Sequence, residues 1–373
     1  MRRPSMIRRL LLGGGLGGGL AAILGRDAIV GSPLAADHHA MPSAAAGHGG
    51  VAYHVHGGMT TVGDVDPRRN GFDPHAMLTD WDTGTPLIDP DGRAAREFHF
   101  VAEEKDIEVA PGVVFPAWTY NGRVPGPSLR AVEGERLRIR FQNHSGHSHG
   151  IHFHNIHPAR MDGAAGAGEV PPGGEFVYEL DAYPFGCHLY HCHTSPLKRH
   201  LHKGLYGALV IDPDPALHPE HADVARSRLL GTPENAAWQE LLMVMNGFDT
   251  NYDDENEVYA VNTVAHAYMK RPITIDRTRP VRVYLVNLTE FDAINSFHLH
   301  ANFFDYYDHG TTLTPTLRMV DTIMQCQGQR GIVEFSFARH EPGLYMFHAH
   351  QTRFAELGWM SLFDVRADGS DQA

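Results

Sequence analysis

The chain has 373 residues, 42% of them hydrophobic, which is enough length and apolar surface for two domains with separate cores and excludes global disorder. Its formal net charge of −13 at pH 7 argues against a nucleic-acid partner. The chain also carries 27 histidines, about three times the number expected at an average usage of roughly 2%. Such an excess of imidazoles requires a chemical explanation.

Residues 1–36 predict an export signal of the twin-arginine type. Arg8 and Arg9 precede an apolar stretch rich in Gly and Leu, and small residues follow it up to Ala36. Glycines interrupt this stretch, and it is shorter than the ~20 apolar residues that a membrane span needs, so we expect no stable span after processing. The predicted location is periplasmic or extracellular.

Residues 37–92 are rich in Gly, Ala, His and Met without a periodic apolar pattern, which predicts a flexible extension. A solvated tail is favoured over weak metal collection by its histidines. From Glu97 onward, short runs such as "RLRIRFQN" and "VRVYLVNL" alternate apolar and polar residues between Gly and Pro turns, the pattern of β-strands. We expect an all-β chain with a first domain at 93–213, a linker at 214–236 and a second domain at 237–373.

Histidines recur at matching positions in the two halves. The first half contains "HSHGIHFHN" and later "YHCH", and the second contains "NSFHLHA" and later "MFHAH". Each half thus supplies two H-x-H pairs, but Asn295 replaces His149 and Ala349 replaces Cys192. Structural zinc sites use C-x(2–4)-C or H-x(3–5)-H spacing, which these motifs do not follow. The pattern therefore favours copper over zinc.

The "YHCH" motif has a direct structural consequence. In an extended strand, residues i and i+2 face the same side and the residue between them faces the other. His191 and His193 therefore converge on one site, and Cys192 must face a second site. The two sites would be joined directly through the chain.

A thiolate with two imidazoles and a weak axial group is the blue-copper arrangement used in electron transfer. Around Cys192, the expected imidazoles are His149 and His200, with His202 the next candidate for the second of them. Leu205 stands where an axial thioether is expected, and Leu cannot coordinate. The oxidised ion is then less stabilised, which predicts a comparatively high reduction potential.

With the motifs "HSHGIHFH", "YHCHTSPLKRHLHKGLYG", "FHLHANFF" and "MFHAH", the chain resembles the two-domain multicopper oxidases, a laccase-like family, over roughly residues 97–365. The resemblance implies two tandem cupredoxin-like Greek-key β-sandwich domains and four coppers per chain. It assigns the type 1 copper to His149, Cys192 and His200, with Leu205 axial and non-bonding. It assigns the type 2 copper to His152 and His298. The two type 3 coppers take the remaining histidines, which are His154, His191, His193, His300, His348 and His350.

The resemblance also implies an activity. A small reducing substrate would donate electrons at the type 1 copper, with His200 facing the donor, and dioxygen would become water at the other three coppers. Phenols, amines and cuprous or ferrous ions all fit such a donor site. Asp162 and Glu356 are the candidate proton relays. Similar proteins are homotrimers with clusters between neighbouring chains, although the residues alone leave open whether the cluster forms within or between chains.

Two other functions are alternatives. The stretch "HKGLYGALVI" resembles a copper nitrite reductase, but that enzyme needs no paired coppers. The His-rich extension fits a non-catalytic copper-binding protein, but such a protein does not need Cys192 flanked by ligands of another site. For Cys187 and Cys326, one disulfide across the domains and two buried free thiols are equal alternatives.

Overall fold

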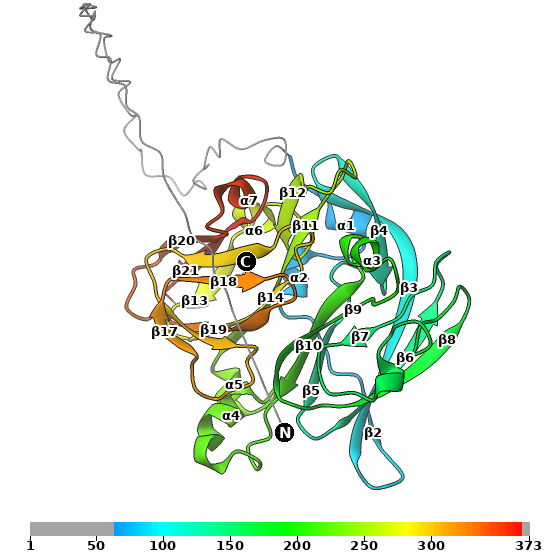
Figure 1. Ribbon diagram of the computed structural model, residues 1–373. Coiled ribbons are helices and arrows are strands. Elements are labelled where there is room, and N and C mark those ends of the chain that lie inside the picture. Colours follow the sequence, from blue (N-terminus) through cyan, green and yellow to red (C-terminus); the bar gives the residue numbers. More distant parts are fainter. Residues whose placement is uncertain (1–62, 368–373) are drawn as a thin grey trace, which may run out of the picture. The chain divides into compact units, whose positions relative to one another are not determined.

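The computed structural model describes residues 63–367, so the predicted export signal and the extension before residue 63 lie outside the described residues. Two β-sheets form in each half of the chain (Figure 1). The first half holds one sheet in the order β1 (Trp81–Asp82), β5 (Ser128–Val132), β10 (Tyr206–Asp212), β9 (Gly186–His191) and β7 (His152–Phe153). Its other sheet has the order β2 (Thr85–Ile88), β3 (Ala94–Ala110), β6 (Arg136–Asn143) and β8 (Glu175–Asp181), and β4 (Val113–Tyr120) pairs with β3.

The second half repeats this plan. Its sheets run in the order β12 (Val258–Val261), β11 (Gln239–Phe248), β14 (Val281–Asn287), β19 (Arg330–Phe335), β16 (Phe304–Asp308) and β17 (Leu317–Val320), and in the order β13 (Ile273–Asp276), β21 (Met360–Arg366), β20 (Gly343–His348), β15 (Ile294–Leu299) and β18 (Thr322–Cys326). These four sheets confirm the predicted all-β fold of two tandem domains.

The internal repeat extends to the direction of strand pairing. In the first half β3 runs parallel to β6 and β5 parallel to β10, while β9 pairs antiparallel with β10 and β7. In the second half β11 runs parallel to β14 and β13 parallel to β21, while β20 pairs antiparallel with β21 and β15. Equivalent strands therefore carry the equivalent histidine motifs.

The hydrophobic core has three parts, one inside each domain and one between them. Leu209 and Ile211 of β10 pack inside the first domain, whereas Ala208 and Val210 of the same strand pack into the third cluster, which also contains residues of β11 and β14. β10 is consequently buried on both faces, which explains its almost continuously apolar sequence "YGALVID". The two domains share a core in addition to their own.

Residues 63–92 differ from the predicted flexible extension. They form α1 (Pro67–Asn70), α2 (Pro74–Met77), β1 and β2, and they pack against both domains. The Asn70 side chain donates to the carbonyl of Glu108 and accepts from its N–H, each at 2.9 Å. The N–H of Leu242 donates to the carbonyl of Leu78 at 2.8 Å. Without an apolar period, the sequence pattern gave no sign of these backbone anchors.

The remaining helices are short and lie between strands. They are α3 (Leu197–His202), the 3-10 turns η2 (Ala159–Met161) and η3 (Pro219–His221), α4 (Ala222–Arg228), α5 (Pro233–Ala236), α6 (Ala267–Lys270) and α7 (Thr352–Glu356). The predicted linker, 214–236, thus contains η3, α4 and α5. None of the helices within residues 63–367 is long and apolar enough to span a bilayer.

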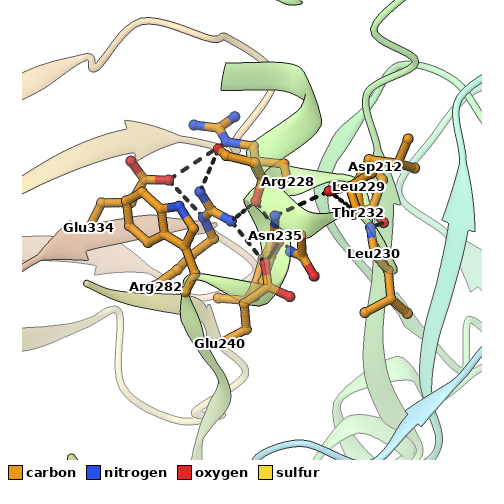
Figure 2. A network of polar contacts seen from close by, with 12 residues as sticks. Asp212, Arg228, Leu229, Leu230, Thr232, Asn235, Glu240, Arg282 and Glu334 are labelled. Carbon is orange, nitrogen blue, oxygen red and sulfur yellow. Dashed lines mark hydrogen bonds and ion pairs between the residues drawn. The ribbon is translucent and has the colours of Figure 1, made fainter. Parts of the chain in front are cut away.

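A buried network of ion pairs joins the two domains, and Figure 2 shows its second-domain side. Arg130 of β5 contacts Asp212 of β10 at 2.9 Å and Glu240 of β11 at 2.6 Å. Arg282 of β14 contacts the other oxygen of Glu240 at 2.9 Å and Glu334 of β19 at 2.7 Å. These side chains are 10% exposed or less. A single carboxylate, Glu240, therefore bridges arginines from both domains.

Aromatic rings cover the three buried guanidinium groups of this region. Trp81 lies 4.8 Å from Arg130, Trp238 lies 4.1 Å from Arg282, and Tyr307 lies 4.2 Å from Arg228 of α4. Arg228 also donates to the carbonyl of Thr312 at 2.8 Å. The rings exclude water from the cations, which strengthens their interactions with the carboxylates.

Removing one buried charge should destabilise the fold strongly. Arg282→Met leaves Glu240 and Glu334 without one of their partners, and we expect a loss of roughly 3–5 kcal/mol in the free energy of unfolding of the copper-free protein, measured with urea. Arg226→Met is the matched control, because its partners in the linker are 45% and 94% exposed, and it should cost less than about 1 kcal/mol. Equal losses in the two variants would contradict this role of the network.

Candidate copper centres

Three potential metal ligands converge in the first domain. His149 precedes β7 and is held by backbone hydrogen bonds in both directions with Val170, Cys192 directly follows β9, and His200 lies in α3. The Nδ1 atoms of His149 and His200 are 3.2 Å apart, and the Sγ of Cys192 lies 3.9 Å from the first and 3.1 Å from the second. These separations suit atoms that share one metal ion at bond lengths of about 2.0–2.3 Å.

The backbone also makes close contacts around the Cys192 sulfur. The N–H of Gly150 donates to the Sγ of Cys192 at 3.4 Å, a contact that stabilises a thiolate. A Cβ on Gly150 would lie 2.0 Å from the carbonyl oxygen of Gly163, so only glycine permits this approach. The N–H of Cys192 donates to the carbonyl of Leu205 at 2.9 Å, and Leu205 is fully buried in the same apolar cluster as Cys192.

Burial keeps both imidazoles of this site neutral. His149 is 0% exposed and His200 is 3% exposed. Burial, assisted by neighbouring positive groups, lowers the pKa of His149 to about 3 and that of His200 to about 4. Protons therefore do not compete for the ligand nitrogens near neutral pH. Most of the His200 ring is shielded from solvent, and the expectation that its remaining edge faces the electron donor stays a prediction.

Trp118 provides much of this shielding, and sequence reasoning missed it. Its ring lies 5.1 Å from that of His149 and 4.9 Å from that of His200, with a 4.6 Å contact to His147 on its other side. The alternative ligand, His202, is instead held at 3.2 Å by the backbone of Asp249. No local pattern distinguishes Trp118 from an ordinary core residue.

The other histidines of the first domain form half of a second site. The Nε2 atoms of His154 and His191 are 2.9 Å apart, and the rings of His152 and His193 are 5.1 Å apart. The Nδ1 of His191 lies 2.9 Å from the carbonyl of Cys192, which leaves its Nε2 free to coordinate. The four imidazoles thus converge on the opposite side of the strand from the Cys192 sulfur.

The second domain repeats this half-cluster almost atom for atom. The Nε2 atoms of His300 and His348 are also 2.9 Å apart, and His348 Nδ1 lies 2.6 Å from the carbonyl of Ala349. His298 pairs with His348 across β15 and β20, just as His152 pairs with His191 across β7 and β9. The rings of His298 and His350 are 5.2 Å apart.

The two half-clusters do not meet in this chain. A hollow of about 470 Å³ beside His152, His154, His191 and His193 is lined on its other side by Cys326 and the loop 327–330, and no histidine of the second half-cluster lines it. Within residues 63–367, no ring contact joins the two sets of imidazoles. His300 and His350 are exposed to solvent. Each half therefore offers four imidazoles of an incomplete site.

The two predicted proton relays differ in position. Asp162 Oδ1 lies 3.0 Å from His152 Nδ1 and 3.8 Å from His157 Nε2, a neighbour that sequence reasoning missed. Glu356 is exposed in α7, outside the cluster of His298, His300 and His348. In the second domain, the position next to His298 Nδ1 is occupied by the Thr322 hydroxyl at 2.8 Å. Asp162 is thus the carboxylate beside the half-cluster of the first domain.

This donor chemistry fits copper. A buried set of two imidazoles and one thiol is a blue-copper ligand set, and separate groups of imidazoles suit further copper ions. Family models described as multicopper oxidase match residues 102–216 and 218–369. The chain belongs to the multicopper oxidase family. Its first domain carries the set of His149, Cys192 and His200, and both domains carry the paired imidazoles.

Known proteins place this multicopper oxidase among related copper proteins. A crystal structure described as a multicopper oxidase is 48% identical, with a TM-score of 0.73, and the match covers 81% of this chain and 100% of that one. A copper nitrite reductase from Nitrosomonas europaea has a TM-score of 0.62, covering 74% of this chain and 95% of that one, but at 20% identity it shows the cupredoxin-like fold alone.

Curated relatives match shorter segments. The copper-containing nitrite reductase of Neisseria meningitidis serogroup A is 30% identical over 134 residues, 35% of this chain and 34% of that protein. A copper resistance protein A homolog of Pseudomonas syringae pv. tomato is 36% identical over 126 residues, 33% of this chain and 21% of that protein. The matched part thus spans about a third or less of these relatives.

The cysteines allow a direct test of the mononuclear site. All three are free thiols, and Cys326 is exposed, so neither the disulfide nor the pair of buried thiols is found. We expect Cys192→Ser to abolish the intense blue thiolate band of the copper-loaded oxidase, because only a thiolate gives that transition. Cys187→Ser, at a buried thiol without an imidazole contact, should retain the band. Absorption spectra of both variants decide the point, and a blue Cys192→Ser protein would exclude Cys192 as the ligand.

Proposed function

We propose that this multicopper oxidase is laccase-like, coupling one-electron oxidation of small donors to the reduction of dioxygen to water. The observation that carries the proposal is the pair of matching half-clusters, each with two Nε2 atoms 2.9 Å apart. The half-cluster of the first domain is also joined through the chain to the separate Cys192 site. Two close imidazole pairs are what a coupled pair of coppers requires. One isolated catalytic copper would not need them.

Copper bound at these sites would supply one-electron redox chemistry at Cys192 and multi-electron chemistry at the imidazole cluster. Four donors, each losing one electron and one proton, balance the four electrons and four protons that convert one dioxygen into two waters. The peptide links from Cys192 to His191 and His193 give the shortest covalent connection between the sites. Asp162, beside His152, is placed to hold and pass protons there.

Nitrite reduction is the second candidate, supported by the curated relatives of that name. Such an enzyme needs an isolated catalytic copper in addition to the blue one. The complete set of eight histidines favours the oxidase. A protein that only binds copper would not need two sites linked through one cysteine.

We infer that the working oxidase is a homotrimer whose clusters form between chains. The half-clusters are separate in one chain, and head-to-tail contact between copies can bring them together in a closed ring. Exposed apolar side chains near each half-cluster support such a contact. Ile156 and Tyr183 lie near the half-cluster of the first domain, and Phe303 and Met324 lie near that of the second domain. All four side chains are at least 52% exposed. We also propose export by the twin-arginine route, which would deliver a folded protein outside the cytoplasm.

Copper stoichiometry and oxygen uptake test the activity. We expect about four coppers per chain, against about two for a nitrite reductase, and oxygen consumption with catechol at one dioxygen per four electrons withdrawn. Metal analysis and an oxygen electrode measure both, and nitrite turnover is assayed in parallel. Two coppers per chain with nitrite turnover and no oxygen uptake would overturn the proposal in favour of the reductase.

Mixing two inactive variants tests the shared cluster. His154→Asn damages the half-cluster of the first domain, and His300→Asn damages that of the second, so each homotrimer should lose oxygen uptake. Random co-assembly of the two chains should restore about a quarter of wild-type activity in the whole population and about a third in the mixed trimers, because each mixed ring has one interface of its three that joins two intact halves. Co-expression with different affinity tags isolates the mixed oligomers. Mixed oligomers without activity would place the cluster within one chain.

A further inference from the structure

A polar and aromatic hollow lies beside the type 1 ligand helix. It has a volume of about 340 Å³ and is lined by Lys198 and Arg199 of α3, by Lys203 directly after α3, by Tyr252 in the loop after β11 and by Phe291 in the loop between β14 and β15. His200, a ligand in the Cys192 site, is the residue after Arg199. The hollow is thus one residue away from a metal ligand, and its volume exceeds that of a single aromatic ring.

Trp118 connects this hollow to the buried imidazoles. The guanidinium carbon of Arg199 lies 5.0 Å from the Trp118 ring, which contacts the rings of both His149 and His200. His149 is 0% exposed and His200 is 3% exposed, so a donor has little of either ring to contact. A molecule held against Arg199 would instead be separated from the site by Trp118 and by the peptide bond to His200.

The hollow carries positive charge that the protein does not neutralise. Arg199 is exposed, and within residues 63–367 no carboxylate lies at ion-pair distance from it. Lys203 donates to the carbonyl of Pro116 at 2.6 Å and to the Tyr252 hydroxyl at 3.3 Å, both uncharged partners. Lys198 is paired with Asp254 at 2.8 Å. Glu104 and Asp106 act on Lys203 only from beyond ion-pair distance. In a chain with a formal net charge of −13, two cations at one hollow without an ion-pair partner among residues 63–367 are a feature that an anion would satisfy.

The two acidic residues in the wall of the hollow, Asp249 and Asp254, do not cancel this charge, because Asp254 is paired with Lys198. Asp249 is 1% exposed and accepts hydrogen bonds from the backbone N–H groups of Tyr252, Asp253 and Asp254. These bonds hold the loop that presents Tyr252, whose φ is 65°. Asp249 therefore acts as a structural anchor, and the Tyr252 and Phe291 rings provide aromatic walls.

We propose that this hollow binds the electron donor and that the donor is a small aromatic molecule bearing a carboxylate, such as a dihydroxybenzoate. The proposal rests on the oxidase function proposed above. The carboxylate pairs with Arg199 and Lys203, and the ring lies between the aromatic walls. On oxidation, the donor loses one electron toward Trp118 and His200 and one proton to solvent, and dioxygen is the final oxidant. Arg199 contacts the substrate, and Trp118 is a positioning residue behind it.

Matched donors test the recognition of the carboxylate. We expect Arg199→Gln to raise the KM for 3,4-dihydroxybenzoate five- to twentyfold, while the KM for catechol, the same ring without a carboxylate, changes less than twofold. Raised ionic strength should raise the KM of the wild-type enzyme for 3,4-dihydroxybenzoate and leave its KM for catechol unchanged. Arg68→Gln, an equal charge change at an exposed residue of α1, should leave both unchanged. Equal changes for the two donors in Arg199→Gln would overturn carboxylate recognition.

Binding to the copper-free protein separates this proposal from the oxidase function. Calorimetric titration should detect 3,4-dihydroxybenzoate binding to the wild-type chain and to Arg68→Gln, with affinity lowered at least fivefold in Arg199→Gln and in Tyr252→Ala. No binding to the wild-type chain, or unchanged binding in both variants at the hollow, would overturn the assignment even if oxygen uptake is normal. Selective binding of 3,4-dihydroxybenzoate without oxygen uptake by the copper-loaded protein would support the binding site at the hollow and contradict the proposed oxidase function.

Discussion

The alternation of side chains at the end of β9 is the constraint on which both metal sites depend. His191 and Cys192 are adjacent, so an extended backbone sends the imidazole to one side and the sulfur to the other. The pairing of β9 with β7 and β10 fixes that alternation, because a slip of one residue would exchange the two faces. Burial on both faces of β10 holds the register in turn. A direct covalent connection between the sites thus follows from ordinary strand geometry.

The two domains must also keep a fixed relation if half-clusters from different copies are to meet. A shared apolar cluster buries surface between the domains, but apolar contacts alone do not specify one orientation of the domains. The buried network around Glu240 adds direction, because its two oxygens accept from Arg130 of one domain and Arg282 of the other. Any rotation between the domains would leave a buried charge unpaired, at a cost of several kcal/mol. We therefore regard this network as the element that would fix the relation of the two half-clusters in the proposed homotrimer.

The histidine spacings predicted most of the candidate sites because strand geometry is local. The structure brings His149, Cys192 and His200 together and holds the alternative His202 apart, and it groups the H-x-H histidines of each domain, while their roles as copper ligands stay predictions. What the sequence could not reveal depends on contacts distant along the chain. Trp118 reaches the site from β4, and the buried ion pairs join residues 42 to 110 positions apart. Residues 63–92 pack through backbone hydrogen bonds that carry no sequence pattern. The buried state of His200 is a result of these contacts.

The second domain shows what replaces the metal when its ligands are lost. The N–H of Ala349 donates to the carbonyl of Trp359, as that of Cys192 does to Leu205, and the N–H of Trp359 donates to Phe354, as that of Leu205 does to His200. Phe354 and Trp359 therefore occupy the ligand and axial positions, and both are buried with Ala349 in the apolar core. Phe354 stacks on Tyr259 at 4.2 Å. Ser296 follows Asn295 where Gly150 follows His149, and its hydroxyl accepts from the N–H of His350 at 2.8 Å. Without a sulfur to approach, a side chain is tolerated there, so the same fold retains the half-cluster while aromatic packing takes the place of the blue copper.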